Sequence, residues 1–101
     1  MKTFKVYTKE KGIVEINNPN DIISLTIHRL DGPAFICYNE NSSVNYELYY
    51  INGNIHRLNG PAYIKYDFNG IIIYEEYWIN CNKYTKDSYY GELLKLKIQI
   101  I

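Results

Sequence analysis

The sequence lacks a surplus of charge of either sign, and it lacks a long apolar run. Lysine plus arginine and aspartate plus glutamate both number 11, so the formal net charge is zero. This balance disfavours nucleic acid and acidic membrane surfaces as partners, because both attract an excess of basic residues. No segment approaches the roughly 20 apolar residues that a membrane-spanning helix needs. We therefore expect neither a nucleic-acid partner nor a membrane span.

Cysteine and histidine are scarce, with two of each. Cys37 and Cys81 occupy unrelated positions of the repeat described below, and the histidines stand a whole repeat apart, so no cluster of metal ligands is formed. The first twelve residues lack an apolar core of signal-peptide length. We expect free thiols, no metal and no cofactor, in a soluble protein of the cytoplasm, or of the host cytoplasm or virion if the source is viral.

What the sequence does contain is an internal repeat. Residues 27–54 align with residues 55–82 without a gap and agree at 16 of 28 positions, and each copy carries His-Arg-Leu-Asp/Asn-Gly-Pro-Ala. The similarity decays before and after these copies, as is common in the terminal units of repeat arrays. We therefore divide a single domain, 1–101, into four parts: an N-terminal cap hairpin (1–20), repeat 1 (21–54), repeat 2 (55–82), and a degenerate repeat with C-terminal cap (83–101).

Each copy predicts a β-hairpin. Residues 34–39 and 62–67 alternate with period two and are rich in β-branched and aromatic types. The alanine, isoleucine and tyrosine side is the same in both copies and is assigned to the core, and the side that begins with Phe35 or Tyr63 is assigned to solvent. Second strands are expected over 44–51 and 72–79. The predicted class is all-β: an antiparallel meander of tandem 28-residue β-hairpin repeats, with a short C-terminal helix as cap.

The turns and the two ends complete the predicted fold. Asn52-Gly53 is typical of a two-residue hairpin turn, and Cys81 at the matching glycine position predicts a different or looser turn. Short strands are expected over 4–7 and 13–16. Thr85 can cap a helix over about 86–97, although the alternation of residues 94–100 also permits a strand.

The shared motif has a structural and a functional interpretation. In the structural one, Asp31-Gly32 and Asn59-Gly60 form tight turns with left-handed glycine, each arginine pairs with a strand glutamate (Glu47, Glu75), and each histidine bonds to a backbone carbonyl. In the functional one, the histidines and arginines hold a carboxylate or phosphate, which suits the guanidinium fork. The candidate ligand or structural turn residues are His28, Arg29, His56 and Arg57.

Tyrosine is abundant, with 12 copies, and too many aromatic residues lie on the predicted strands for one thin core. They could form a flat contact surface for a protein, glycan or base, or cross-strand ladders that only stabilise the sheet. Both interpretations stay open. The candidate binding residues are Tyr49, Tyr50, Tyr63, Tyr77 and Trp78.

The string YYINGNIHRLNGPA, residues 49–62, resembles the MORN-variant repeats common in giant DNA viruses and found in some bacterial and phage proteins. The similarity covers about two-thirds of the chain. It implies a sheet of repeated hairpins, of the kind linked to protein scaffolding. The chain departs from the pattern before His28, at Cys81, and after residue 82.

No catalytic residue is assigned, since nothing in the sequence places a cysteine beside a histidine, and no phosphate-binding loop is present. We expect a non-enzymatic repeat module for protein–protein interaction or scaffolding, of viral origin, with a protein partner or self-association. The alternative is a protein that sequesters a small ligand, a nucleotide or sugar, through the repeated His-Arg sites. That alternative requires an open cavity beside an arginine that has no carboxylate partner in the chain.

Overall fold

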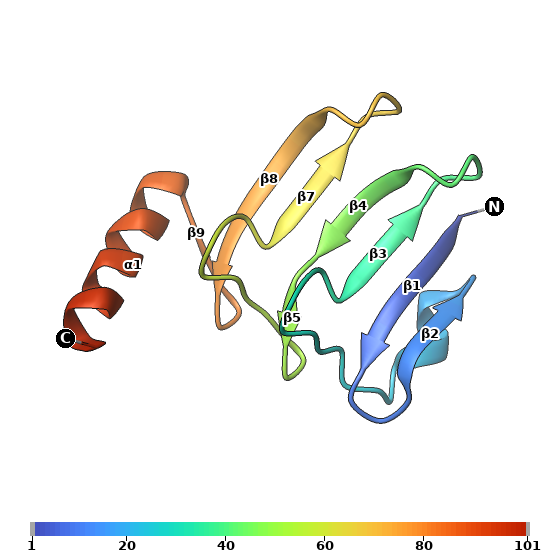
Figure 1. Ribbon diagram of the computed structural model, residues 1–101, viewed down its shortest axis with the longest axis horizontal. Coiled ribbons are helices and arrows are strands. Elements are labelled where there is room, and N and C mark those ends of the chain that lie inside the picture. The colour runs from blue at the N-terminus through green and yellow to red at the C-terminus, as the bar shows by residue number, and fades with distance from the viewer. Residues whose placement is uncertain (1, 101) are drawn as a thin grey trace.

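The computed structural model describes residues 2–100, with side chains described as far as residue 97. Within them, a seven-stranded antiparallel sheet has the order β2-β1-β3-β4-β7-β8-β9, and β5 and β6 form a separate small hairpin (Figure 1). The expected antiparallel meander with one C-terminal helix is confirmed. The elements are β1 (Thr3–Thr8), β2 (Gly12–Ile16), η1 (Pro19–Ile22), β3 (Phe35–Tyr38), β4 (Val44–Leu48), β5 (Tyr50–Ile51), β6 (Asn54–Ile55), β7 (Tyr63–Tyr66), β8 (Ile72–Ile79), β9 (Asn82–Tyr84) and α1 (Lys86–Ile100).

The N-terminal hairpin joins the sheet through β1, which pairs with β3 as β4 pairs with β7. Val6 stands opposite Phe35, and Leu48 stands opposite Tyr63, the residue 28 positions after Phe35. Strand β1 therefore occupies the place that a preceding copy of β4 would take. The sequence alignment does not show this relation, because β2 and η1 separate β1 from the first His-Arg-Leu motif.

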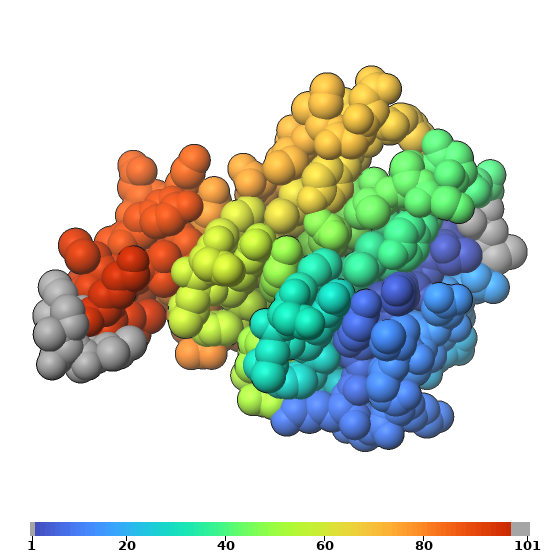
Figure 2. Space-filling model, viewed as in Figure 1, coloured from blue at the N-terminus to red at the C-terminus, as the bar shows by residue number. Residues whose placement is uncertain are grey.

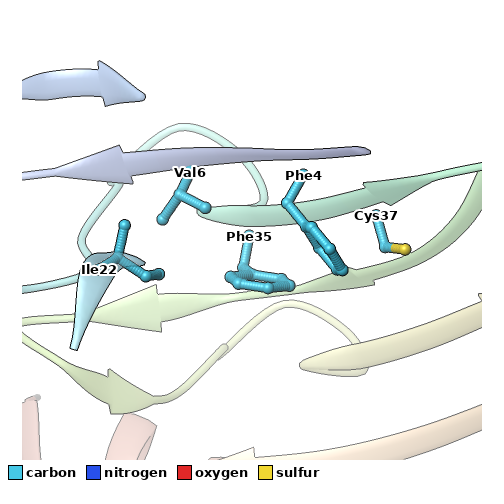
Figure 3. Close-up of a cluster of buried hydrophobic side chains, with 5 residues drawn as sticks. All are labelled: Phe4, Val6, Ile22, Phe35 and Cys37. Atoms are coloured by element: carbon cyan, nitrogen blue, oxygen red, sulfur yellow. The ribbon is translucent and has the colours of Figure 1, made fainter. Parts of the chain in front are cut away.

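The main apolar cluster lies on the side of the sheet that was expected to face solvent. Phe35 and Cys37 of β3 are buried there against Phe4, Val6 and Ile22 (Figure 3). The assignment of this side to solvent is therefore wrong for the first copy, because the segment through η1 covers it. In the second copy no described segment covers the corresponding side in this way, and Lys65 is exposed.

The opposite side of the sheet is covered by other parts of the chain. Ala34, Ile36, Ala62 and Ile64 are all buried there, as the alternation predicts. Figure 2 views this side and shows both motif turns on it, teal for the first copy and yellow-green for the second, with α1 beyond them. The sheet is therefore covered on both sides near its N-terminal end, and mainly on one side near β8.

Strand β4 is shorter than predicted. It ends at Leu48, and Tyr50 and Ile51 pair instead with Ile55 and Asn54 in the β5–β6 hairpin. The break falls at Tyr49, whose backbone N–H bonds to the carbonyl of Ala62 and whose carbonyl accepts from the N–H of His56. The second copy has no such break, and β8 runs from Ile72 to Ile79 without interruption.

The two hairpin turns are alike, although the second lacks glycine. Asn52 and Gly53 have φ of 51° and 80°, and Asn80 and Cys81 have φ of 47° and 66°. The expectation of a different or looser turn at Cys81 is therefore wrong. The turn is held because the N–H of Cys81 bonds to the carbonyl of Ile55 at 3.0 Å, as the N–H of Gly53 bonds to Ile27.

Helix α1 begins after Thr85, whose hydroxyl accepts a hydrogen bond from the N–H of Ser88 at 3.2 Å. The predicted cap and helix are confirmed, whereas the alternative strand over 94–100 is wrong. Tyr89 and Leu93, one helical turn apart, pack on Tyr77 and Ile79 of β8. This packing selects the helix over the strand, since it buries Tyr89 completely.

We expect Cys81→Gly to raise the free energy of unfolding by about 0.5–1 kcal/mol, because glycine removes the cost of a left-handed conformation. Gly53→Ala should lower it by about 1 kcal/mol for the reverse reason. Urea unfolding followed by circular dichroism measures both. Loss of stability in Cys81→Gly would contradict the claim that the two turns share one geometry.

Candidate functional site

The first motif closes around the guanidinium of Arg29. Its Cζ lies 4.0 Å from the centre of the Tyr7 ring. Its Nε donates to Asp31 Oδ1 at 2.9 Å, and its Nη1 donates to the carbonyl oxygen of Pro33 at 3.1 Å. We call this arrangement, with the backbone of Gly32 on the far side of the guanidinium, the Arg29 clasp. It ties the motif turn to β1 through a stacked cation and to its own backbone through two hydrogen bonds.

The second motif repeats the arrangement as the Arg57 clasp. The Cζ of Arg57 lies 3.9 Å from the centre of the Tyr49 ring. Its Nε donates to Asn59 Oδ1 at 3.0 Å, and its Nη1 donates to the carbonyl oxygen of Pro61 at 3.0 Å. Tyr49, one of the predicted contact residues, is therefore the floor of this clasp.

Each clasp explains the glycine of its motif. A Cβ atom on Gly32 would lie 2.8 Å from Cζ of Arg29, and one on Gly60 would lie 3.0 Å from Cζ of Arg57. The φ of Gly32 is not positive, so the expectation of a left-handed glycine is wrong there. The glycine is needed at Gly32 because the guanidinium occupies the space that a Cβ atom would fill.

The expected pairing of the arginines with strand glutamates is wrong. Arg29 pairs with Asp31 of its own turn, and the guanidinium lowers the pKa of that exposed carboxyl through its hydrogen bond. Asn59 takes the place of Asp31 in the second clasp, and Arg57 forms no ion pair among the described side chains. Glu47 accepts a hydrogen bond from the hydroxyl of Tyr66 at 2.6 Å instead.

The histidines accept hydrogen bonds from backbone amides and not, as expected, donate to carbonyls. Nδ1 of His28 accepts from the N–H of Asn52 at 2.9 Å, and Nδ1 of His56 accepts from the N–H of Asn80 at 3.0 Å. An accepting Nδ1 requires the neutral ring. Burial lowers the pKa of His56, which favours this neutral form. The histidines therefore hold the following hairpin turns in place.

Helix α1 takes the place of a third clasp. Tyr77 lies 28 residues after Tyr49, and the ring of Tyr89 lies 4.8 Å from it, centre to centre. The hydroxyl of Tyr89 lies 2.5 Å from the carbonyl oxygen of Arg57 and 2.9 Å from that of Gly60, and it accepts from the N–H of Gly60 at 3.2 Å. The helix therefore locks onto the backbone of the Arg57 clasp.

A cavity of about 370 Å³ lies between the two clasps. Leu30 and Leu58, the leucines of the two motifs, are 81% and 47% exposed at this cavity. The full lining is Arg29, Leu30, Asp31, Gly32, Tyr49, Ile51, His56, Arg57, Leu58 and Asn59. Of the four predicted ligand or turn residues, the two arginines belong to the clasps and the two histidines hold the hairpin turns; Arg29, His56 and Arg57 line this cavity.

Five aromatic rings cross the sheet in a row from β1 to β8. Successive ring centres lie 5.5, 6.2, 5.8 and 5.7 Å apart. Such spacing is typical of cross-strand aromatic pairs that stabilise a sheet. The row consists of Phe4, Phe35, Tyr46, Tyr63 and Tyr74.

The other predicted contact residues are also engaged within the chain. Tyr50 packs on the first core cluster, Tyr77 is buried beneath α1, and Trp78 donates its Nε1–H to Glu76. None of the five predicted contact residues is among the strongly exposed apolar side chains. Those near β8 are Phe68, Ile71, Ile72, Ile73 and Tyr74.

This exposed group, which we call the β8 edge patch, was missed at the level of sequence. A signal for it exists, since the second copy carries Ile71-Ile72-Ile73 where the first carries Ser43-Val44-Asn45. Ile72, Ile73 and Tyr74 of the patch lie on an open strand edge, and Phe68 and Ile71 lie in the turn that precedes it. Strand β9 pairs only with Tyr77–Ile79 of β8, so among the described residues the outer edge of 72–76 has no partner strand.

No metal centre is found in the described part of the chain. Residues 2–100 hold no group of three or more histidine, cysteine, aspartate or glutamate residues placed to bind a metal. Cys37 is fully buried, and burial raises the pKa of its thiol, while Cys81 lies exposed in its turn. No helix in these residues has the length and apolar character to span a membrane.

Searches with known family models, against curated proteins and against solved structures find no match to this chain.

We expect Tyr89→Phe to lower the free energy of unfolding by about 1–3 kcal/mol, because the buried N–H of Gly60 and the carbonyl of Arg57 lose their hydroxyl partner. Tyr90→Phe is the matched control, since Tyr90 is 49% exposed and its substitution should change stability by less than about 0.5 kcal/mol. Equal stability of both variants in urea would contradict the locking role of Tyr89.

Proposed function

We propose that this chain is a non-enzymatic module for protein–protein interaction and scaffolding, built from two tandem 28-residue β-hairpins of the MORN-variant type. The recurrence of contacts supports the tandem arrangement. Clasp bonds, histidine bonds and β-bulges each recur 28 residues apart, the bulges between Cys37 and Tyr38 and between Lys65 and Tyr66. A viral source belongs to this proposal through the family resemblance alone.

The β8 edge patch is the observation that carries the interaction role. An open strand edge offers unpaired backbone N–H and C=O groups to another strand, and proteins usually protect such edges with charge, proline or a covering segment. Here two neighbouring apolar residues are exposed, Ile72 at 48% and Ile73 at 57%, and Glu75 is the exposed charge on this edge. The edge therefore combines free hydrogen-bonding groups with apolar side chains that gain from burial.

A second copy of this chain is the occupant that fits the edge. Antiparallel pairing of two β8 strands centred on Ile73 places Glu75 opposite Ile71 of the other copy, so the glutamates of the two strands do not meet. Like charges directly opposite one another would destabilise such a pair. The contact is also self-complementary, as a two-fold dimer requires. The scaffold unit is thus a dimer with one continuous sheet.

The ligand-sequestering alternative receives partial support. The cavity between the clasps is open, and Arg57 has no carboxylate partner among the described side chains. However, its Nε, its Nη1 and one ring-stacked face are already engaged, and Nδ1 of His56 holds the N–H of Asn80. A His-Arg anion site would have only the remaining Nη hydrogens of Arg57, without Nδ1 of His56, so the interaction role is favoured.

We expect Ile73→Lys to convert the dimer into a monomer, because a charged side chain at the centre of the pairing cannot be buried without a partner. Size-exclusion chromatography with light scattering over a concentration series measures the mass. The matched control is Ile13→Lys on the opposite sheet edge, where Ile13 is 56% exposed, and it should stay dimeric. A monomeric wild-type chain at the highest attainable concentration would overturn the proposal.

A further inference from the structure

The cavity between the clasps has a filled counterpart in the same molecule. Shifting three of its lining residues by 28 gives residues that contact Tyr89: Arg29 and Gly32 become Arg57 and Gly60, and Tyr49 becomes Tyr77. The chain therefore shows in its second half what the backbone of a clasp binds.

What it binds there is a phenol hydroxyl. The hydroxyl of Tyr89 accepts from the N–H of Gly60 and lies 2.5 Å from the carbonyl oxygen of Arg57, to which it donates. A group at this seat must accept one hydrogen bond and donate another. A carboxylate can only accept and an ammonium group can only donate, whereas a hydroxyl does both.

The corresponding backbone groups of the first clasp, the N–H of Gly32 and the carbonyl of Arg29, are open to a ligand. Gly60 is buried beneath Tyr89, whereas Gly32 is half-exposed. In the described part of the chain, no group hydrogen-bonds to the N–H of Gly32 or to the carbonyl oxygen of Arg29. Leu30 is 81% exposed, against 47% for Leu58 of the second clasp. The unpaired N–H of Gly32 and carbonyl of Arg29 therefore lie beside exposed leucine side chains, whose contact with water is unfavourable.

We propose that this cavity is a binding site for the side chain of a tyrosine from a separate protein partner. The hydroxyl accepts from the N–H of Gly32 and donates to the carbonyl of Arg29, and the ring lies between Leu30 and Leu58. The ring cannot stack on Tyr49 as Tyr89 stacks on Tyr77, because the guanidinium of Arg57 already stacks there. It lies instead at the edge of that guanidinium, within a cavity of about 370 Å³ that opens between the two turns seen in Figure 2.

Tyrosine fits this site better than a smaller hydroxyl residue. Serine and threonine carry the same hydroxyl but lack the apolar ring that the two leucines require. Phenylalanine fills the apolar part but leaves the N–H of Gly32 and the carbonyl of Arg29 without a partner. Tyrosine is also a preferred anchor in protein interfaces, because it joins a large ring to one polar atom.

Amide NMR of the ¹⁵N-labelled chain tests the proposal, with N-acetyl-tyrosinamide as the probe. We expect a saturable shift of the Gly32 amide and no shift of the Gly60 amide, which Tyr89 already occupies. N-acetyl-phenylalaninamide should bind at least about fivefold more weakly, because the seat then stays unpaired. No saturable shift at Gly32, or equal affinity for both probes, would overturn the proposal.

Two variants separate this site from the rest of the molecule. Leu30→Glu removes part of the apolar wall and should weaken binding of N-acetyl-tyrosinamide at least fivefold, whereas Ile23→Glu, at a residue 88% exposed and outside the cavity, should leave it unchanged. Ile73→Lys should also bind the probe as the wild type does, so the result does not depend on dimer formation. The chain should also be diluted without probe. If the Gly32 amide shift then changes, a second copy of this chain occupies the cavity, and this would contradict the proposal of a separate partner.

Discussion

The guanidinium of each motif arginine, held between a tyrosine ring and a glycine backbone, ties a polar turn onto the face of a thin sheet. The molecule measures only 19 Å along its shortest axis, so one face of the sheet depends on such turns for cover. The clasp assigns a reason to nearly every residue of the motif. The arginine stacks on a tyrosine ring. Its N–H groups donate to the side chain of aspartate or asparagine and to the carbonyl of proline, and the glycine leaves space for the guanidinium. The partly buried bonds to the carbonyls of Pro33 and Pro61 contribute most of the stabilisation from the two clasps, because solvent screens the exposed bonds to Asp31 and Asn59. They matter in a domain whose total stability is small.

The ends of the chain complete the clasps in two different ways. At the N-terminal end, β1 brings Tyr7 under Arg29, where a preceding repeat would have supplied its own tyrosine. At the C-terminal end, Thr85 stands at the arginine position and begins α1, whose Tyr89 covers Tyr77. This exchange of a clasp for a helix leaves the outer edge of β8 open. The proposed dimer contact and the helical cap both follow from the replacement of the third motif and its strand by α1.

The amino-acid pattern allowed much of the fold to be predicted, and less of the site. Period-two alternation and the Asn-Gly turn depend on local chemistry, so strands, hairpin and capped helix followed from them. Contacts between distant segments could not be predicted. The cover that buries Phe35 and Cys37 comes from Ile22 in an inserted segment, and the partner of Arg29 comes from Tyr7, which lies outside the aligned copies. The arginine contacts were misassigned because repetition indicates that a residue is needed, without showing which neighbour needs it.

A double-mutant cycle between Gly32 and Arg29 tests the clasp most directly. The φ of Gly32 is not positive, so alanine there strains the chain mainly through its Cβ, which would lie 2.8 Å from Cζ of Arg29. In the wild-type background, displacement of the guanidinium from Tyr7 and Asp31 should make Gly32→Ala cost about 1–2 kcal/mol in urea unfolding. In the Arg29→Met background the same substitution should cost less than about 0.5 kcal/mol. An equal cost in both backgrounds would show that the glycine serves the backbone alone and would contradict the clasp.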